Sequence, residues 1–414
     1  MLSVLGIIFA PELVILYAGG FRAIFWKFDL TVSLTRVMFP FFPLVAMAAV
    51  TMGALNAMGY FFLPAFAPVL FNLASIFAGL VFCPLLVTYT TINPIYGMAW
   101  GVVLGGFLQF YVQWRKMRQE GLDLRAHFDW SRWSKPWTTP GVREVLVLII
   151  PGTVGLAATQ LNILINSIFA TGKGSGAVSW LNYAFRLMQF PIGIFGVSLA
   201  AATLPRVVRA LSTPREAGTQ IESSLKLCFA VNLSAAAGLM GVGLPIIQMI
   251  FEHGHFKYFD SLQTSQALFW YALGLPGYSA VKILVPIFYA LGTTRIPVIS
   301  SFVMVALNAL INFIFLVVLK YPFWALALAT SVTSTLNAVI LFYYLKKSFA
   351  DLSTKSVVKS LGLYTVLGIG VFIACLLSIR KILFRCSRRL SPSNTRMQNG
   401  MPLPWMHGSE SRRK

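Results

Sequence analysis

The chain contains eleven apolar stretches, most of them close to the ~20 residues that a helix needs to cross the hydrocarbon core of a membrane. Four stretches precede one long basic segment, and seven follow it. They cover residues 1–18, 34–57, 61–86, 94–114, 142–169, 177–205, 224–251, 265–291, 296–319, 322–345 and 357–380. Because lipid cannot satisfy open backbone hydrogen bonds, such segments must be helical. The predicted fold class is all-α, a polytopic membrane helical bundle of about eleven transmembrane helices.

Composition excludes an ordinary soluble domain. Hydrophobic residues make up 57% of the 414 residues and charged residues only 11%. The formal net charge of +21 is also found in nucleic-acid-binding proteins, but in a membrane protein it is expected of basic cytoplasmic loops, so no nucleic-acid partner is predicted. None of the four cysteines lies at metal-ligand spacing, and neither disulfides nor a zinc site are predicted. No cofactor is expected.

The distribution of Lys and Arg predicts the topology. Segment 115–143 carries seven basic residues, whereas 87–95 carries no charge, so the basic loop is expected in the cytoplasm. By alternation, loop 252–263 faces outward. The segment after residue 380 is rich in Arg, Ser, Pro and Asn, a composition typical of a disordered tail.

A short repeat suggests two lobes. Ala57-Met58-Gly59 is followed after four residues by Pro64, and Ala290-Leu291-Gly292 is followed after four residues by Pro297. Six spans separate the copies, as expected of a transporter built from two repeated halves. Two helices are then missing from the first lobe. The predicted organisation is an incomplete N-terminal lobe at 1–114, a basic cytoplasmic loop at 115–141, a C-terminal lobe at 142–346, an additional transmembrane helix at 347–380 and a basic disordered tail at 381–414.

Polar residues inside the spans are the candidates for function. Arg186 lies about two turns inside its span, and Asn182 and Gln189 share its helix face. An arginine facing lipid is costly, so Arg186 either lines a water-filled cavity as an anion-binding group or reaches the membrane surface with its long side chain. No acidic residue on that helix can pair with it. An unpaired guanidinium suits phosphate, which it binds through two parallel hydrogen bonds.

Two further cations are candidates. Lys282 lies between Pro276 and Pro286, which predict a bent or broken helix of the kind that borders binding cavities. Arg36 opens the second span, where an anchor at the membrane surface is the alternative role. The remaining intramembrane carboxamides, among them Asn162, Asn166, Asn308, Asn312 and Asn337, are expected to form hydrogen bonds between helices. No carboxylate pair or nucleophile with a base occurs within the spans, so an enzyme is not predicted.

Four ordered segments resemble a known family. Residues 36–76, 149–170, 176–207 and 281–298 are similar to the MurJ/MviN lipid II flippases of bacteria, and the similarity runs from the start of the chain to about residue 350. The resemblance implies the fold of the multidrug/oligosaccharidyl-lipid/polysaccharide exporter superfamily, in a multi-pass protein of the bacterial cytoplasmic membrane. It implies movement of lipid II, an undecaprenyl pyrophosphate that carries a disaccharide-pentapeptide, by alternating access. Membrane lipids and other cell-wall synthesis proteins are the further partners it implies.

The resemblance also assigns roles. Arg186 matches a cavity arginine of the family, whereas Phe185 and Gln189 stand where some members have acidic residues, so it gives no basis for ion coupling there. The first two family helices and the last one have no counterpart, and the chain is expected to be truncated at both ends. The alternative functions are a drug or polysaccharide exporter of the same superfamily and an inactive truncated membrane protein.

Overall fold

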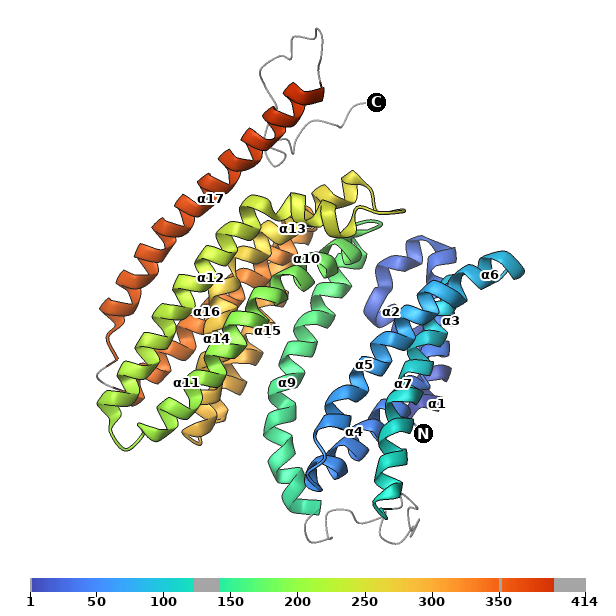
Figure 1. Cartoon of the computed structure of the whole chain (residues 1–414), viewed down its shortest axis with the longest axis horizontal. Coiled ribbons are helices and arrows are strands. Elements are labelled where there is room, and N and C mark those ends of the chain that lie inside the picture. Colours follow the sequence, from blue (N-terminus) through green and yellow to red (C-terminus); the bar gives the residue numbers. More distant parts are fainter. Residues whose placement is uncertain (1, 123–141, 350–351, 391–414) are drawn as a thin grey trace. The chain divides into compact units, whose positions relative to one another are not determined.

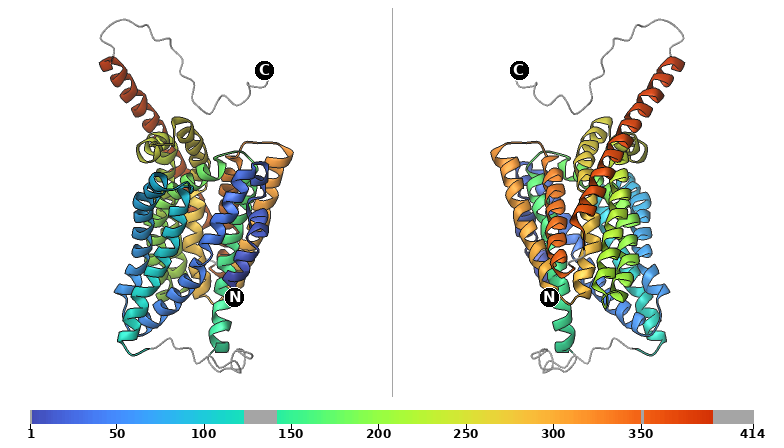
Figure 2. Two further views of the ribbon diagram at one scale, coloured as in Figure 1. Left: turned by 90° about the vertical axis from the view of Figure 1, so that its right-hand side faces the viewer. Right: turned by 90° about the vertical axis from the view of Figure 1, so that its left-hand side faces the viewer.

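The computed structural model describes residues 2–122, 142–349 and 352–390 (Figures 1 and 2). Helices account for nearly all of these residues, and no strand occurs among them, which confirms the all-α prediction. The chain divides into two compact units, Met1–Arg143 and Glu144–Lys414, each with its own packing.

In the described part of the first unit, residues 2–122, the helices form four rods. Proline, glycine or a tight turn interrupts most of them, so the rods are made of shorter elements. The elements are α1 (Leu2–Ile8), α2 (Ala10–Ala18), η1 (Gly19–Ala23), α3 (Phe25–Met38), α4 (Phe41–Ala57), α5 (Phe62–Phe77), the π-helical η2 (Ala78–Phe82), α6 (Cys83–Tyr89) and α7 (Ile95–Gln119).

Glycines bring α7 close to its neighbours. A Cβ on Gly101 would lie 2.3 Å from the Cβ of Ala78, and a Cβ on Gly105 would lie 2.8 Å from the ring of Phe71. Because only a hydrogen fits at these two positions, the helices can approach at backbone distance. The small-residue face of this span therefore packs α7 against α5 and η2.

The second unit contains the remaining seven rods. It is larger, and two buried apolar clusters form its core. Its elements are α9 (Val142–Thr171), α10 (Ala177–Pro191), the π-helical η4 (Ile192–Val197), α11 (Ser198–Arg209), α12 (Pro214–Phe251), α13 (Tyr258–Leu273), α14 (Leu275–Ala290), α15 (Arg295–Phe313), the π-helical η5 (Ile314–Val318), α16 (Ala325–Ser348) and α17 (Thr354–Leu390).

Every expected span coincides with one of these rods. Within the described ranges, eight helices are long and apolar enough to cross a membrane, or nine if α13 and α14 form one span. The other two expected spans correspond to α9 and to α1 with α2. The boundaries differ in places: α3 begins at Phe25 rather than at residue 34, and α7 continues to Gln119, beyond the expected loop start at 115.

The carboxyl-terminal helix is also longer than expected. Helix α17 continues to Leu390, so residues 381–390, expected in the tail, are helical, and residues 391–414 lie outside the described part of the chain. It packs along α12 (Figure 1), where a Cβ on Gly241 would lie 2.7 Å from the Cβ of Cys375.

The two copies of the sequence repeat have the same local structure. Gly59 and Gly292 follow the ends of α4 and α14 with φ of +84° and +71°, a left-handed conformation that favours glycine. In each turn the next residue bonds back across the glycine: Tyr60 N–H donates to the carbonyl of Leu55 at 2.9 Å, and the N–H of Thr293 donates to that of Phe288 at 3.0 Å. These are Schellman caps. The helix that follows each turn carries its proline, Pro64 or Pro297, at its third residue.

A polar cluster joins the end of α7 to the α4–α5 turn. The ammonium group of Lys116 lies 4.5 Å from the ring centre of Tyr60 and pairs with Glu120. Hydrogen bonds from Lys116 and Tyr60 hold the pKa of the Glu120 carboxyl below its ordinary value. The carboxylate of Glu120 therefore links the two segments while it is ionised.

Candidate functional site

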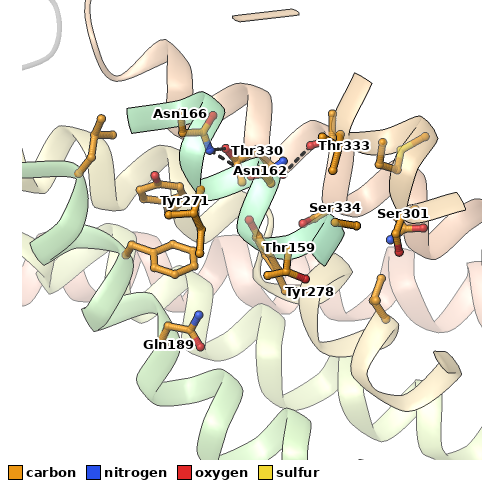
Figure 3. A pocket seen from close by; sticks show the side chains of 18 of the residues that line it. Thr159, Asn162, Asn166, Gln189, Tyr271, Tyr278, Ser301, Thr330, Thr333 and Ser334 are labelled. Atoms are coloured by element: carbon orange, nitrogen blue, oxygen red, sulfur yellow. Dashed lines mark hydrogen bonds between the residues drawn. The ribbon is translucent and has the colours of Figure 1, made fainter. Parts of the chain in front are cut away.

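A cavity of about 280 Å³ lies inside the second unit (Figure 3). Helices α9, α10, α13, α14, α15 and α16 surround it. Its polar lining residues are Thr159, Asn162, Asn166, Ser167, Asn182, Gln189, Tyr271, Tyr278, Lys282, Ser301, Thr330, Thr333, Ser334 and Asn337. The cavity therefore combines carboxamide and hydroxyl groups with an apolar wall.

Helical periodicity explains how α10 contributes to this lining. Five of its residues, Val178, Leu181, Asn182, Phe185 and Gln189, line the cavity together with Ile192, the first residue of η4. At about 100° per residue they fall within an arc of about 100°, one side of a regular helix. Arg186 lies about 40° beyond Asn182 on the same projection, at the border of this arc. That position accounts for its exposure beside a cavity that it does not line.

The break between α13 and α14 positions three lining residues. The two helices are bent by 47° at Gly274, which confirms the predicted bend, although it lies eight residues before Lys282. Gly274 allows the bend to pack closely against α16, because a Cβ on Gly274 would lie 2.7 Å from the Cα of Ser331. The hydroxyl of Ser331 donates at 2.7 Å to the Trp270 carbonyl, in the last turn of α13. Tyr271, Tyr278 and Lys282 are thereby directed toward the cavity from one continuous stretch of chain.

A carboxamide network forms the wall between α9, α15 and α16. The side chain of Asn166 donates to Asn162 Oδ1 and to Thr330 Oγ1, both at 3.1 Å (Figure 3). Fully buried Asn312 donates to Asn166 Oδ1 at 2.7 Å and to Asn308 Oδ1 at 2.9 Å. The predicted interhelical role is confirmed for Asn166 and Asn312, whereas the bond of Asn162 lies within α9. Asn312 Oδ1 is buried and accepts no hydrogen bond from a described group.

The charge of the cavity lining is weakly positive. Lys282 is the one charged residue among the described residues that line the cavity, and its side chain is exposed. Within the described ranges, Lys282 has neither a hydrogen bond nor an ion pair, and neither has Arg186. Both cations therefore remain available to a ligand.

The five predicted site residues do not all lie at one site. The structure brings Asn182, Gln189 and Lys282 to one cavity and leaves Arg186 exposed at its border. Arg36 belongs to the first unit, where its Nε donates to the carbonyl of Ile7 at 3.3 Å. Its part in a ligand site remains a prediction.

Several lining residues escaped the sequence analysis. Nothing in the sequence distinguishes Tyr271 and Tyr278 from the apolar span that contains them, and within the polar stripe of α16 the sequence analysis assigns a role to Asn337 alone. That stripe, Thr330, Thr333, Ser334 and Asn337, recurs at intervals of three and four residues, so its periodicity could have been detected.

Comparisons with known proteins agree with this architecture. A model of the family described as lipid II flippase MurJ matches residues 1–387. The lipid II flippase MurJ of Burkholderia cenocepacia is 33% identical over 349 residues, covering 84% of this chain and 66% of that protein. The probable lipid II flippase MurJ of Buchnera aphidicola subsp. Acyrthosiphon pisum is 30% identical over 347 residues, covering 82% of this chain and 64% of that protein. The chain thus spans slightly less than two thirds of these relatives.

Solved structures show the same fold. A lipid II flippase MurJ in an inward closed conformation superposes with a TM-score of 0.71 at 23% identity, covering 94% of this chain and 81% of that one. An inward-facing multidrug resistance MATE transporter of the MOP superfamily superposes with a TM-score of 0.65 at 16% identity, covering 86% of this chain and 80% of that one. Given the family match over residues 1–387, the chain belongs to the lipid II flippase MurJ family.

Proposed function

We propose that this chain moves lipid II from the cytoplasmic to the outer leaflet of the bacterial cytoplasmic membrane, where its multi-pass helices reside. The observation that carries the proposal is the family match, which extends over the helices of both units. The second unit supplies matching chemistry, because Arg186 is an exposed intramembrane cation without a partner among the described groups. An ionisable residue of this kind within a membrane span marks a substrate path more often than a structural site.

Arg186 is proposed to bind the pyrophosphate of the substrate. Its planar guanidinium can donate two parallel hydrogen bonds to phosphate oxygens, and Lys282 adds positive potential from α14. Asn182 and Gln189, on the same face of α10, add neutral hydrogen-bonding groups. The function is transport without covalent change of the substrate.

Alternating access is the proposed mechanism. Proteins of this fold have been solved in inward-facing and outward-facing conformations. The proteins that make and consume lipid II are proposed as further partners, because the substrate passes directly between them.

Complementation tests the function. A strain depleted of its own lipid II flippase should grow when this chain is expressed, with the Burkholderia cenocepacia relative as the positive control. Failure to rescue at equal membrane expression, while the relative rescues, contradicts the proposal. Export of drugs without rescue would favour a different exporter, and an absence of both activities would indicate an inactive protein.

Substitutions at Arg186 test the site. Arg186→Ala should lower flipping by at least about tenfold, since a hydrogen bond to a charged group contributes about 1.5–3 kcal/mol. Arg186→Lys should recover part of the activity, and Lys282→Ala should have a smaller effect. Arg209→Ala, an exposed cation at the end of α11, is the matched control. Wild-type flipping by Arg186→Ala at equal expression removes the residue from the site.

A further inference from the structure

Several polar groups that line the cavity of the second unit have no hydrogen-bond partner among the described residues. Gln189 has no hydrogen bond to another described residue, and Asn337 has none through its amide nitrogen. The side-chain oxygen of Asn182 is also free of described donors, because Asn182 only donates, to the carbonyl of Val178 at 2.8 Å. Each of these groups lines the cavity. They offer donors and acceptors together, which suits a ligand that has both.

The lining also excludes some ligand classes. Among the described residues that line the cavity there is no carboxylate, so a divalent cation would lack its preferred ligands there. Lys282, the one cation among the described lining residues, could not by itself neutralise the negative charge of a pyrophosphate buried inside the cavity. The lining therefore suits a neutral ligand. An anionic group attached to that ligand could reach Arg186 at the border of the cavity.

Aromatic rings complete the chemistry. Tyr271 and Tyr278 both line the cavity (Figure 3). Phe185 also lines it and meets Tyr271 edge to face, with ring centres 5.5 Å apart. The negative face of an aromatic ring attracts weakly positive C–H groups, such as those on the apolar face of a sugar ring. Hydroxyl and acetamido substituents at the edge of the same ring would meet the free carboxamides.

Size limits the ligand further. The volume of about 280 Å³ is slightly below the range of small-molecule sites, roughly 300–1,000 Å³. It cannot contain a disaccharide with an attached peptide. One ring of such a head group is the largest part that fits.

We propose that this cavity is a subsite for a single neutral N-acetylated pyranose ring of the substrate, whose phosphates lie at the border of the cavity, where Arg186 is, with Lys282 of the lining adding positive potential. The inference rests on the proposed function, since it assigns one part of that substrate to one cavity. It assigns specificity for the sugar to the second unit alone, through α10, α14 and α16.

Binding of a free monosaccharide tests the subsite. The whole chain in lipid nanodiscs is mixed with N-acetylglucosamine, and saturation transfer to the acetyl methyl group is measured by NMR. Wild-type protein should transfer saturation, and Ser301→Phe, which places a ring in the cavity, should abolish the transfer. Gln189→Leu should weaken binding by about threefold to tenfold, as expected for one or two lost hydrogen bonds.

Gln160→Leu is the matched control, because Gln160 is an exposed glutamine on α9 that does not line the cavity. It should bind the sugar like wild type. Equal transfer by wild type, Ser301→Phe and Gln189→Leu overturns the inference, and Gln189→Leu alone decides it if Ser301→Phe does not fold.

Two further outcomes separate this inference from the proposed function. If purified lipid II binds but N-acetylglucosamine does not, the subsite is wrong and the flippase proposal stands. If neither binds, both fail. Stabilisation by sodium ions that Ser301→Phe removes, without any effect of the sugar, would show that the cavity is a cation site and overturn the sugar assignment.

Discussion

The carboxamide network predicts a measurable coupling between α9 and α15. Asn312→Ala removes two hydrogen bonds, to Asn166 and to Asn308. The bond to Asn166 joins two helices, and such bonds in membrane proteins contribute about 0.6 kcal/mol on average and at most about 1.7 kcal/mol. The bond to Asn308 lies within α15. With a similar value for this second bond, the expected loss is about 1.2 kcal/mol of unfolding free energy. Removal of Asn312 Oδ1, a buried acceptor without a described partner, offsets part of this loss.

The coupling is isolated by a double-mutant cycle. Unfolding free energies of wild type, Asn166→Ala, Asn312→Ala and the double variant are measured by reversible denaturation in mixed micelles. The shared hydrogen bond should appear as a coupling of about 0.6 kcal/mol, and losses that add within about 0.3 kcal/mol refute the reasoning. Asn72→Ala is the control: Asn72 is exposed and without a described hydrogen bond, so its change should stay within about 0.5 kcal/mol.

Two further predictions concern packing and pH. Gly277→Ala should cost about 1–3 kcal/mol of unfolding free energy, because its Cβ would lie 2.8 Å from the Cα of Thr335 and α14 would have to move away from α16. Gly53→Ala is the control and should cost nothing, because a Cβ there has no atom within 4 Å. Equal stability of the two variants contradicts the close contact. For Glu120, the folded pKa is lowered, so its contribution to stability is present above the unfolded pKa of about 4.3 and is lost as the pH falls through the folded pKa. Acid titration of the melting temperature should therefore show a steeper decline for wild type than for Glu120→Gln, and identical profiles would exclude this linkage.

Much of the architecture could be predicted from the sequence because the constraints that the bilayer imposes act on each segment separately. A segment of about 20 apolar residues must satisfy its own backbone hydrogen bonds, so each span could be recognised as a helix without knowledge of its neighbours. The repeat is local as well, since a left-handed glycine and a bond across it require only the residues of one turn. Gly59 and Gly292 both have this local structure.

The candidate site was only partly accessible from the sequence. Helical periodicity placed Asn182, Arg186 and Gln189 on one face, and all three are exposed there. Periodicity could not decide which edge of that face borders a cavity, because this depends on where the neighbouring helices lie. Arg186 therefore lies beside the cavity, while Asn182 and Gln189 line it.

The sequence alone determined the helical class, the spans, the repeat turns and the interhelical role of the asparagines. Only the tertiary structure decided the partners of those asparagines and joined Tyr271 and Tyr278 to the site. Hydrophobicity and periodicity are properties of one segment, whereas a cavity is formed by side chains from six helices up to 179 residues apart in the chain, from Ala158 to Asn337. Their meeting depends on glycine contacts and on the bend at Gly274, whose direction is set by the helix against which it packs.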